Sequence, residues 1–229
     1  MNSALNKTAR RSVRAGADHG ATTEAAEVGE PKRSYHHGNL RAHLMAAALE
    51  IVRETGAASL SLRDAARRAG VSHTAPYRHF RNRAALLAVL AEEGFRDMAA
   101  EMQAASAAAE DEPIERLRLM GLAYVRFAAR HPGHFRVMFG PEAAYEHDHS
   151  VRHAGEGVYT LMRDALEQAQ DLGQLRNDDY RIQARTAWAL MHGLASLIVD
   201  GRIPAPDDAA LEKLVGETQQ ALSIGMERR

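Results

Sequence analysis

The sequence predicts an all-α fold with a small N-terminal helical domain and a larger C-terminal helical domain. Apolar residues recur at helical spacing from Leu40 onward, and no segment shows the alternation typical of a strand. Hydrophobic residues make up 45% of the chain and aromatic residues only 5%, a composition rich in Ala, Leu, Arg and Glu that favours helices. At 229 residues the chain is long enough to bury a sizeable core.

The first helices follow a polar tail. Residues 1–31 are rich in Ala, Gly, Thr and Glu without apolar periodicity, so we expect a disordered tail. The first helix runs from Leu40 and is ended by Gly56. Ser61 is the expected N-cap of the second helix, because Asp64 three residues later completes a pattern close to a capping box.

A tight turn separates the second helix from the third. Gly70 suits the left-handed position that ends a helix, and Val71 can fill the turn. Ser72 is the expected N-cap of the third helix. This helix must begin near His73, because Pro76 has no N–H and is tolerated only in a first helical turn.

The remaining chain is also predicted to be helical. A long helix starts at about Asn82 and another covers 114–130. The stretch HPGHFRVMFG indicates a break followed by a short helix, and AYEHDHSVRHAG indicates a polar loop. The last helices are expected at roughly 151–172, 178–200 and 207–226.

Charge is distributed unevenly along the chain. The net charge of −1 combines +7 over residues 32–83, zero over 1–31 and −8 over 84–229. A basic module on an acidic body predicts that only the first part meets a polyanion. A solvated basic face is the alternative explanation of the charge alone.

The composition also indicates the cellular compartment in which the protein is expected. The chain has no cysteine, which excludes disulfides and thiolate metal sites and fits the reducing cytoplasm. No apolar run approaches the roughly 18 residues that span a bilayer, and the N-terminus lacks the apolar core of a signal peptide. We therefore expect a cytoplasmic protein that does not contact a membrane.

A helix-turn-helix presents the start of its second helix to the major groove of DNA. Ser72, His73 and Thr74 lie at that start, where base edges are closest, and Ala75 is small enough to approach a thymine methyl. Tyr77 can donate to phosphates. The same role suits His79 and Arg83.

Residues 38–87 resemble the DNA-binding domain of the TetR family of transcriptional regulators. The resemblance is carried by AALEIVRETGAASLSLRDAARRAGVS, by YRHF, and by a basic residue followed by ALL. It implies phosphate contacts from Ser61, Tyr77 and Arg83, and a base contact from Arg63. The chain departs from the family at Arg83, where Lys is commoner, and at Pro76, which is more often aliphatic and is expected to displace the start of the recognition helix. The expected DNA-binding residues are Ser61, Arg63, Ser72, His73, Thr74, Ala75, Tyr77, Arg78, His79 and Arg83.

The resemblance divides the chain into the tail (1–31), a helix-turn-helix domain (32–87) and a C-terminal domain (88–229) for ligand binding and dimerisation. The segments YVRFAARHPGHFRVMF and AWALMHGL resemble a subgroup whose C-terminal domain carries a Trp followed by His-Gly. Trp188 and His192 share a helix face, as core or interface residues or as ligand contacts. The expected pocket residues are Met120, Tyr124, Phe127, Phe135, Met138, Met162, Trp188 and His192. The expected dimer residues are Ala189, Gly193, Leu197, Leu211, Leu214 and Val215.

The sequence gives little support for a metal site or a catalytic site. His147, His149 and His153 could bind zinc or nickel, but they fall in a polar loop without further ligands, so we expect no metal and no cofactor. No nucleophile elbow, phosphate loop or metalloprotease motif is present, so we expect no enzymatic activity.

We therefore expect a homodimeric regulator, most simply a repressor, that binds double-stranded operator DNA and an unidentified small-molecule effector. Two alternatives stay open. One is an activator with the same DNA chemistry. The other is an α-helical binding protein or enzyme whose basic segment is incidental.

Overall fold

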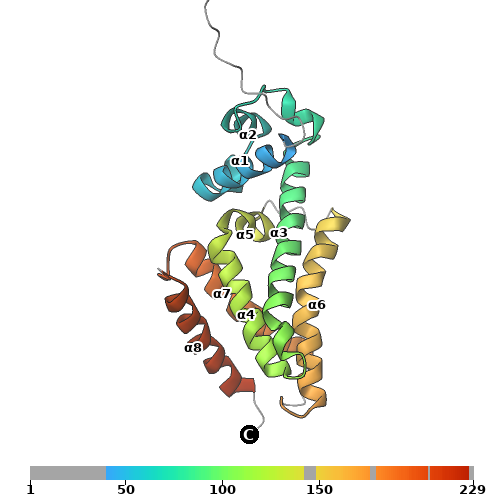
Figure 1. Ribbon diagram of the computed structural model, residues 1–229, viewed down its shortest axis with the longest axis vertical. Helices are drawn as coiled ribbons and strands as arrows, with labels where there is room; N and C mark the ends of the chain where they lie inside the picture. The colour runs from blue at the N-terminus through green and yellow to red at the C-terminus, as the bar shows by residue number, and fades with distance from the viewer. Residues whose placement is uncertain (1–39, 142–147, 176–178, 206, 227–229) are drawn as a thin grey trace, which may run out of the picture. The chain divides into compact units, whose positions relative to one another are not determined.

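The structure is a computed structural model that describes residues 40–141, 148–175, 179–205 and 207–226 (Figure 1). All of them belong to one compact unit that spans residues 36–229, and the expected tail 1–31 lies outside the described residues. Every regular element in the described ranges is a helix, as predicted. The α-helices are α1 (Leu40–Thr55), α2 (Leu62–Arg68), α3 (Arg83–Ser106), α4 (Pro113–Arg130), α5 (Pro132–Phe139), α6 (His149–Asp171), α7 (Tyr180–Val199) and α8 (Asp208–Met226). The 3-10 helices are η1 (Ala57–Ser59), η2 (Ala75–Arg78) and η3 (Ala107–Ala109).

We call residues 40–82, which hold α1, η1, α2 and η2, the reading head. The expected stop of α1 at Gly56 is confirmed, with φ at 83°. The Ser61 hydroxyl accepts the Asp64 N–H and caps α2. Gly70 ends this helix at φ 69°, and the N–H groups of Gly70 and Val71 bond back to the last turn of α2. Local signals in the sequence therefore determine both ends of α2.

The third helix differs from the prediction. It is the short 3-10 helix η2, its N-cap is Thr74 instead of Ser72, and His73 lies in the turn before it. Pro76 sits in its first turn, as expected. The segment is short because α3 begins soon afterwards, where the Asn82 side chain accepts the Ala85 N–H.

We call residues 83–226 the body. Its helix α3 packs against α4, α5 and α6, while α4 also contacts α6, α7 and α8 (Figure 1). The helix α3 runs without a break across residue 87, where the sequence places the end of the DNA-binding domain. The short helix α5 contacts α1, so it joins the body to the reading head.

The predicted polar loop before α6 is too long. Residues 142–147, including His147, lie outside the described part of the chain. The helix itself starts at His149, earlier than expected, because the Asp148 carboxylate accepts two N–H groups of the first turn and Val151 is fully buried. Among the described residues, no helix combines the length and the apolar character that a membrane crossing requires.

Candidate nucleic-acid interface and ligand cavity

The recognition segment presents polar side chains to solvent. Ser72, His73 and Thr74 are exposed, and the hydroxyls of Ser72 and Thr74 are 3.3 Å apart. Tyr77 is 53% exposed, although Phe80, three residues later, is buried in the core. The segment thus has an apolar side that anchors it and a polar side that is accessible. Arg78 and His79 are also exposed, whereas Ala75 is half-buried.

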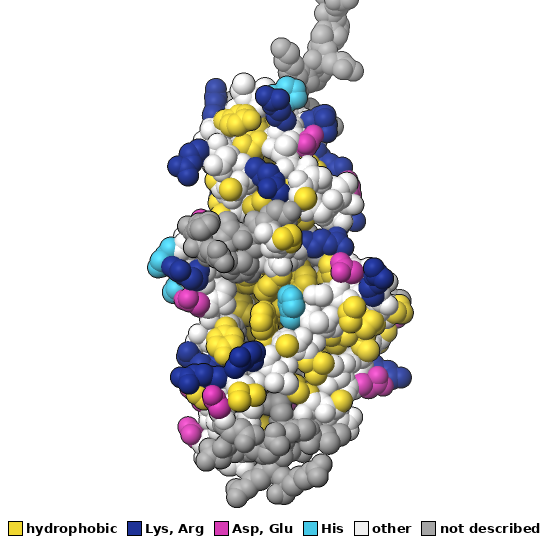
Figure 2. All heavy atoms as spheres, turned by 180° about the vertical axis from the view of Figure 1, so that it is seen from behind, with side chains coloured by type: hydrophobic (Ala, Val, Ile, Leu, Met, Phe, Trp, Pro, Cys, Tyr) yellow, Lys and Arg dark blue, Asp and Glu magenta, His cyan; other side chains and the backbone are white. Residues whose placement is uncertain are grey.

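The arginines of the reading head fall into two groups. Arg53 and Arg67 pair with neighbouring acids, and Arg68 forms two hydrogen bonds with Glu54 at 2.8 and 2.5 Å, which ties α2 to α1. A second group makes no ion pair with the described residues and is exposed: Arg41, Arg63, Arg78 and Arg81. Lys and Arg side chains gather over this part of the molecule (Figure 2). The second group can neutralise phosphates without first losing an acidic partner.

Two residues expected to contact DNA form hydrogen bonds within the protein. The Ser61 hydroxyl accepts the Asp64 N–H and donates to the Asp64 carboxylate at 2.5 Å. The half-buried Arg83 donates to the Ala57 carbonyl oxygen at 2.6 Å, which ties the start of α3 to η1. We therefore assign both side chains first to the fold. Arg81 was not among the expected DNA-binding residues, although its place beside Asn82 could have identified it.

The body encloses a cavity of about 1250 Å³ between α4, α6, α7 and α8. Most of its lining is apolar, with Phe95 and Met102 contributed by α3 and Leu166 by α6. On the molecular surface it is a hollow with hydrophobic side chains on its floor and Lys or Arg side chains beside it (Figure 2). Its size exceeds the ordinary range of roughly 300–1,000 Å³ for ligand pockets, so it can hold an organic molecule of substantial size.

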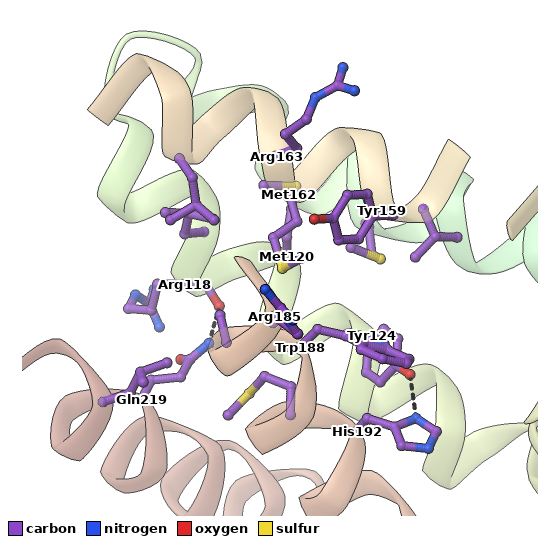
Figure 3. A pocket seen from close by; sticks show the side chains of 18 of the residues that line it. Arg118, Met120, Tyr124, Tyr159, Met162, Arg163, Arg185, Trp188, His192 and Gln219 are labelled. Carbon is purple, nitrogen blue, oxygen red and sulfur yellow. Dashed lines mark hydrogen bonds between the residues drawn. The ribbon is translucent and has the colours of Figure 1, made fainter. Parts of the chain in front are cut away.

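Five of the eight residues expected in the pocket line this cavity. Three others are core residues: Phe127, Phe135 and Met138 are at most 4% exposed and are not part of the lining. Met138 lies against Gly94 of α3 and the Phe135 ring packs against Tyr124 of α4, a distinction that the apolar pattern does not contain. The five that line it are Met120, Tyr124, Met162, Trp188 and His192 (Figure 3).

A polar pair lies in the cavity wall. The Tyr124 hydroxyl hydrogen-bonds with Nδ1 of His192 at 2.9 Å. Burial raises the pKa of the Tyr124 phenol and lowers the pKa of the His192 imidazole, so both groups are neutral near pH 7. The His192 ring also lies 4.6 Å from Phe139 of α5 and 5.4 Å from Trp188, measured between ring centroids. This pair therefore connects the cavity to α5.

Part of the cavity lining is polar and was not predicted from the sequence. Gln219 of α8 donates to the Arg118 carbonyl oxygen at 2.9 Å, while its own buried side-chain oxygen has no hydrogen-bond partner among the described residues. Tyr159 and Arg185 also line the cavity (Figure 3). These residues lie on the polar sides of their helices, so a search for apolar residues excludes them. Arg185 lies at helical spacing from Trp188 and His192, so the sequence could have predicted it as a lining residue.

The residues expected to form a dimer interface are of two kinds. Leu211 and Val215 are 3% and 1% exposed and pack inside the chain. The others are accessible to different degrees: Ala189 and Leu197 are exposed, whereas Gly193 and Leu214 are half-buried.

The histidines at the start of α6 share a helix face, as their spacing allows. The rings of His149 and His153 are stacked with centroids 6.5 Å apart. Within the described part of the chain, no three His, Cys, Asp or Glu residues are grouped to hold a metal ion.

Comparisons with known proteins place this arrangement in a family. Residues 44–90 match the model of bacterial regulatory proteins of the tetR family, and residues 117–218 match the model of the tetracyclin repressor-like C-terminal domain. A search of curated proteins found no significant match.

Solved structures agree with the family models. A protein of unknown function from Rhodococcus sp. RHA1 is 35% identical, with a TM-score of 0.72 over 86% of this chain and 100% of its own. The fatty acid degradation regulator FadR from Bacillus halodurans shares the fold at 17% identity, with a TM-score of 0.67 over 80% of this chain and 93% of its own. SmeT, the repressor of the Stenotrophomonas maltophilia multidrug efflux pump SmeDEF, shares the fold at 23% identity, with a TM-score of 0.62 over 82% of this chain and 90% of its own. This chain therefore belongs to the TetR family and is a DNA-binding transcriptional regulator, a class of proteins that are not enzymes.

Proposed function

We propose that this protein is a ligand-responsive repressor that binds a palindromic operator as a homodimer. One observation carries the proposal: α7 borders the cavity with one face and exposes an apolar stripe on the neighbouring face. Trp188 and His192 are on the first face, and Ile182 and Leu197 are on the second. A ligand that moves α7 would therefore change the surface on which a second copy docks.

The apolar stripe of α7 supports the homodimer. Ile182 and Leu197 are 57% and 44% exposed, and Leu190 lies between them with a similar exposure. Large apolar side chains that share one helix face in solvent are typical of an interaction surface. Ala189 and Gly193 on the same stripe are small enough for two helices to approach closely. Such a stripe can pair with its own copy about a two-fold axis.

The reading head supports the operator. Two heads related by a two-fold axis engage successive major grooves when they lie roughly 34–36 Å apart, or at a further multiple of the helical turn. The DNA contacts that we propose combine base-facing residues with unpaired cations on each head. The proposed contacts are Arg63, Ser72, His73, Thr74, Ala75, Tyr77, Arg78, Arg81 and His79.

A short chain of contacts supports the response to ligand. Arg136 of α5 donates to the Arg53 carbonyl oxygen of α1 at 2.9 Å and to the Val199 carbonyl oxygen of α7 at 3.0 Å. The same helix contributes Phe139 to the cavity. A ligand with different affinities for two positions of α5 and α7 would thus favour one spacing of the reading heads over another. We propose that the ligand-bound spacing does not fit the operator.

Selection of bound fragments from random DNA tests the operator, together with sedimentation of the free protein. We expect a dimeric mass and a consensus made of two inverted half-sites. An asymmetric consensus bound by a monomer would overturn the proposal. A reporter gene with the selected site overlapping its promoter then distinguishes repression from activation, because a repressor lowers expression and an activator raises it.

A further inference from the structure

The charged side chains around the cavity are mostly cationic. Five arginines line it against a single acid, Glu156. Two of the five are neutralised: Arg118 forms two hydrogen bonds with the Glu115 carboxylate, both at 2.7 Å, and Arg163 pairs with Asp164 at 2.7 Å. The others, among the described residues, have no acidic partner: Arg152, Arg181 and Arg185.

Two of these unpaired arginines are one turn apart on α7. Arg181 lies with its guanidinium carbon 5.4 Å from the centre of the Tyr180 ring, and Tyr180 itself lines the cavity. The Arg185 guanidinium is directed toward the middle of the lining, whereas that of Arg163 points away from the cavity (Figure 3). Arg185 also precedes Trp188 by three residues, so both side chains lie on the same helix face.

The rest of the cavity suits an apolar body. Met120 and Met162 face each other from α4 and α6, and thioether side chains adapt to ligands of irregular shape (Figure 3). Leu166 and Trp188 extend this apolar surface. The neutral pair of Tyr124 and His192 adds hydrogen-bonding groups without adding charge.

We propose that the effector of this site is an amphipathic organic anion, with a single carboxylate-type head group at Arg185 and Arg181 and a long apolar body in the cavity. The inference rests on the proposed function, in which this cavity is the effector site. A guanidinium is always charged and presents a planar fork of donors that matches a carboxylate. A cationic effector would face three unneutralised arginines, and a neutral one would leave them without an anion.

The only tryptophan of the chain makes the test direct. Trp188 lines the cavity, so its fluorescence is expected to respond to a ligand bound there. The probes are dodecanoate, dodecan-1-ol and dodecyltrimethylammonium, which share a chain length and differ in head-group charge. We expect dodecanoate to bind at least about tenfold more tightly than the alcohol, because charged hydrogen bonds are worth that factor or more, and the cation to bind most weakly.

Substitutions test whether the two arginines of α7 cause the preference for dodecanoate over the alcohol. Arg185→Gln is expected to bring the dissociation constant of dodecanoate to within about threefold of that of the alcohol, and Arg181→Gln to reduce the preference less. Both side chains are exposed, so neither change should affect folding, which circular dichroism checks. Lys213→Gln removes an exposed cation of α8 outside the cavity and should leave the preference intact.

The outcomes separate the inference from the proposed function. Equal binding of dodecanoate and dodecan-1-ol, a preference that survives Arg185→Gln and Arg181→Gln together, or no response of Trp188 to any probe would overturn the anionic effector. Operator affinity is measured in parallel by fluorescence anisotropy of labelled DNA. If dodecanoate binds with the expected preference and operator affinity does not change, the anion site is supported and the ligand-responsive function is overturned.

Discussion

The reading head and the body place their functional side chains in opposite ways. The reading head packs its apolar residues into a filled core, with Leu44, Val52 and Ala65 fully buried, and exposes the polar groups that we propose to meet DNA. The body leaves an unfilled space among its helices, and the side chains that we propose to bind a ligand surround it. Because a close-packed core resists deformation, the reading head is expected to move as a unit, while the body can rearrange around a ligand. Regulation then depends on the helix that joins them.

That joining helix is α5. Gly133 is buried so close to α1 that an added Cβ would lie 2.8 Å from the Leu49 carbonyl oxygen. Arg136 bonds to carbonyl oxygens of α1 and α7 from the same helix. The reading head is thus held to the body by the close approach of Gly133 to the α1 backbone and by the Arg136 side chain, which bonds to both α1 and α7.

The largest expected effect comes from Gly193→Arg on the exposed stripe of α7. An added Cβ at Gly193 meets no atom within 4 Å, so the substitution fits the isolated chain. A charged side chain there would block the docking of a second copy. We expect folded monomers by sedimentation and circular dichroism. Operator affinity should fall by about 100-fold or more, because the second head no longer binds at high effective concentration.

Gly157→Arg is the matched control for this substitution. It also places an arginine at a helical glycine with open space around it, but on α6. It should stay dimeric and bind DNA normally. A Gly193→Arg protein that remains a dimer with full operator affinity would show that the interface lies on other helices.

The second prediction concerns the contact between the two regions. Gly133→Ala forces a methyl group against the α1 backbone, and overpacking of this kind costs about 1–3 kcal/mol of stability. Urea unfolding measures the loss. Gly157→Ala has free space and removes a flexible glycine from a helix, so it should stabilise the protein by roughly 0.5–1 kcal/mol. If both variants gain stability, α5 and α1 are not in the tight contact described above.

How far the sequence predicts the structure also differs between the two regions. The end of α1 and both ends of α2 follow from Gly56, Ser61 and Gly70, which act on their immediate neighbours, and the sequence predicts them correctly, although it places the start of the third helix too early. The cavity depends on packing between helices far apart in the chain. Apolar spacing therefore cannot separate Met120, which lines it, from Met138, which fills the core. The roles of Arg83 and Ser61 depend in the same way on the carbonyl or carboxylate beside them.

The third prediction tests base recognition by the reading head. Arg63 is exposed and unpaired at the start of α2, so we expect Arg63→Ala to lose about 1–3 kcal/mol of discrimination at one symmetric pair of operator positions. Selection from random DNA with the variant measures it. Arg67→Ala provides the control. The Arg67 guanidinium pairs with the Asp64 carboxylate at 2.6 Å, so we expect this substitution to leave the consensus unchanged. An unaltered consensus for Arg63→Ala would reassign this residue to the phosphate backbone.

The smallest expected effect separates two arginines that look alike in the sequence. Each phosphate contact contributes about −0.9 to the slope of log K against log[salt]. Arg78 is exposed and unpaired, so Arg78→Ala should flatten that slope by about 0.9 for each reading head. Arg83 instead donates to the Ala57 carbonyl oxygen, so Arg83→Ala should leave most of the slope and lower the free energy of unfolding by about 1 kcal/mol. The opposite result for Arg83, a flattened slope with unchanged stability, would mean that its guanidinium leaves Ala57 for a phosphate when DNA binds. The fold of the reading head would then not depend on the contact between η1 and α3.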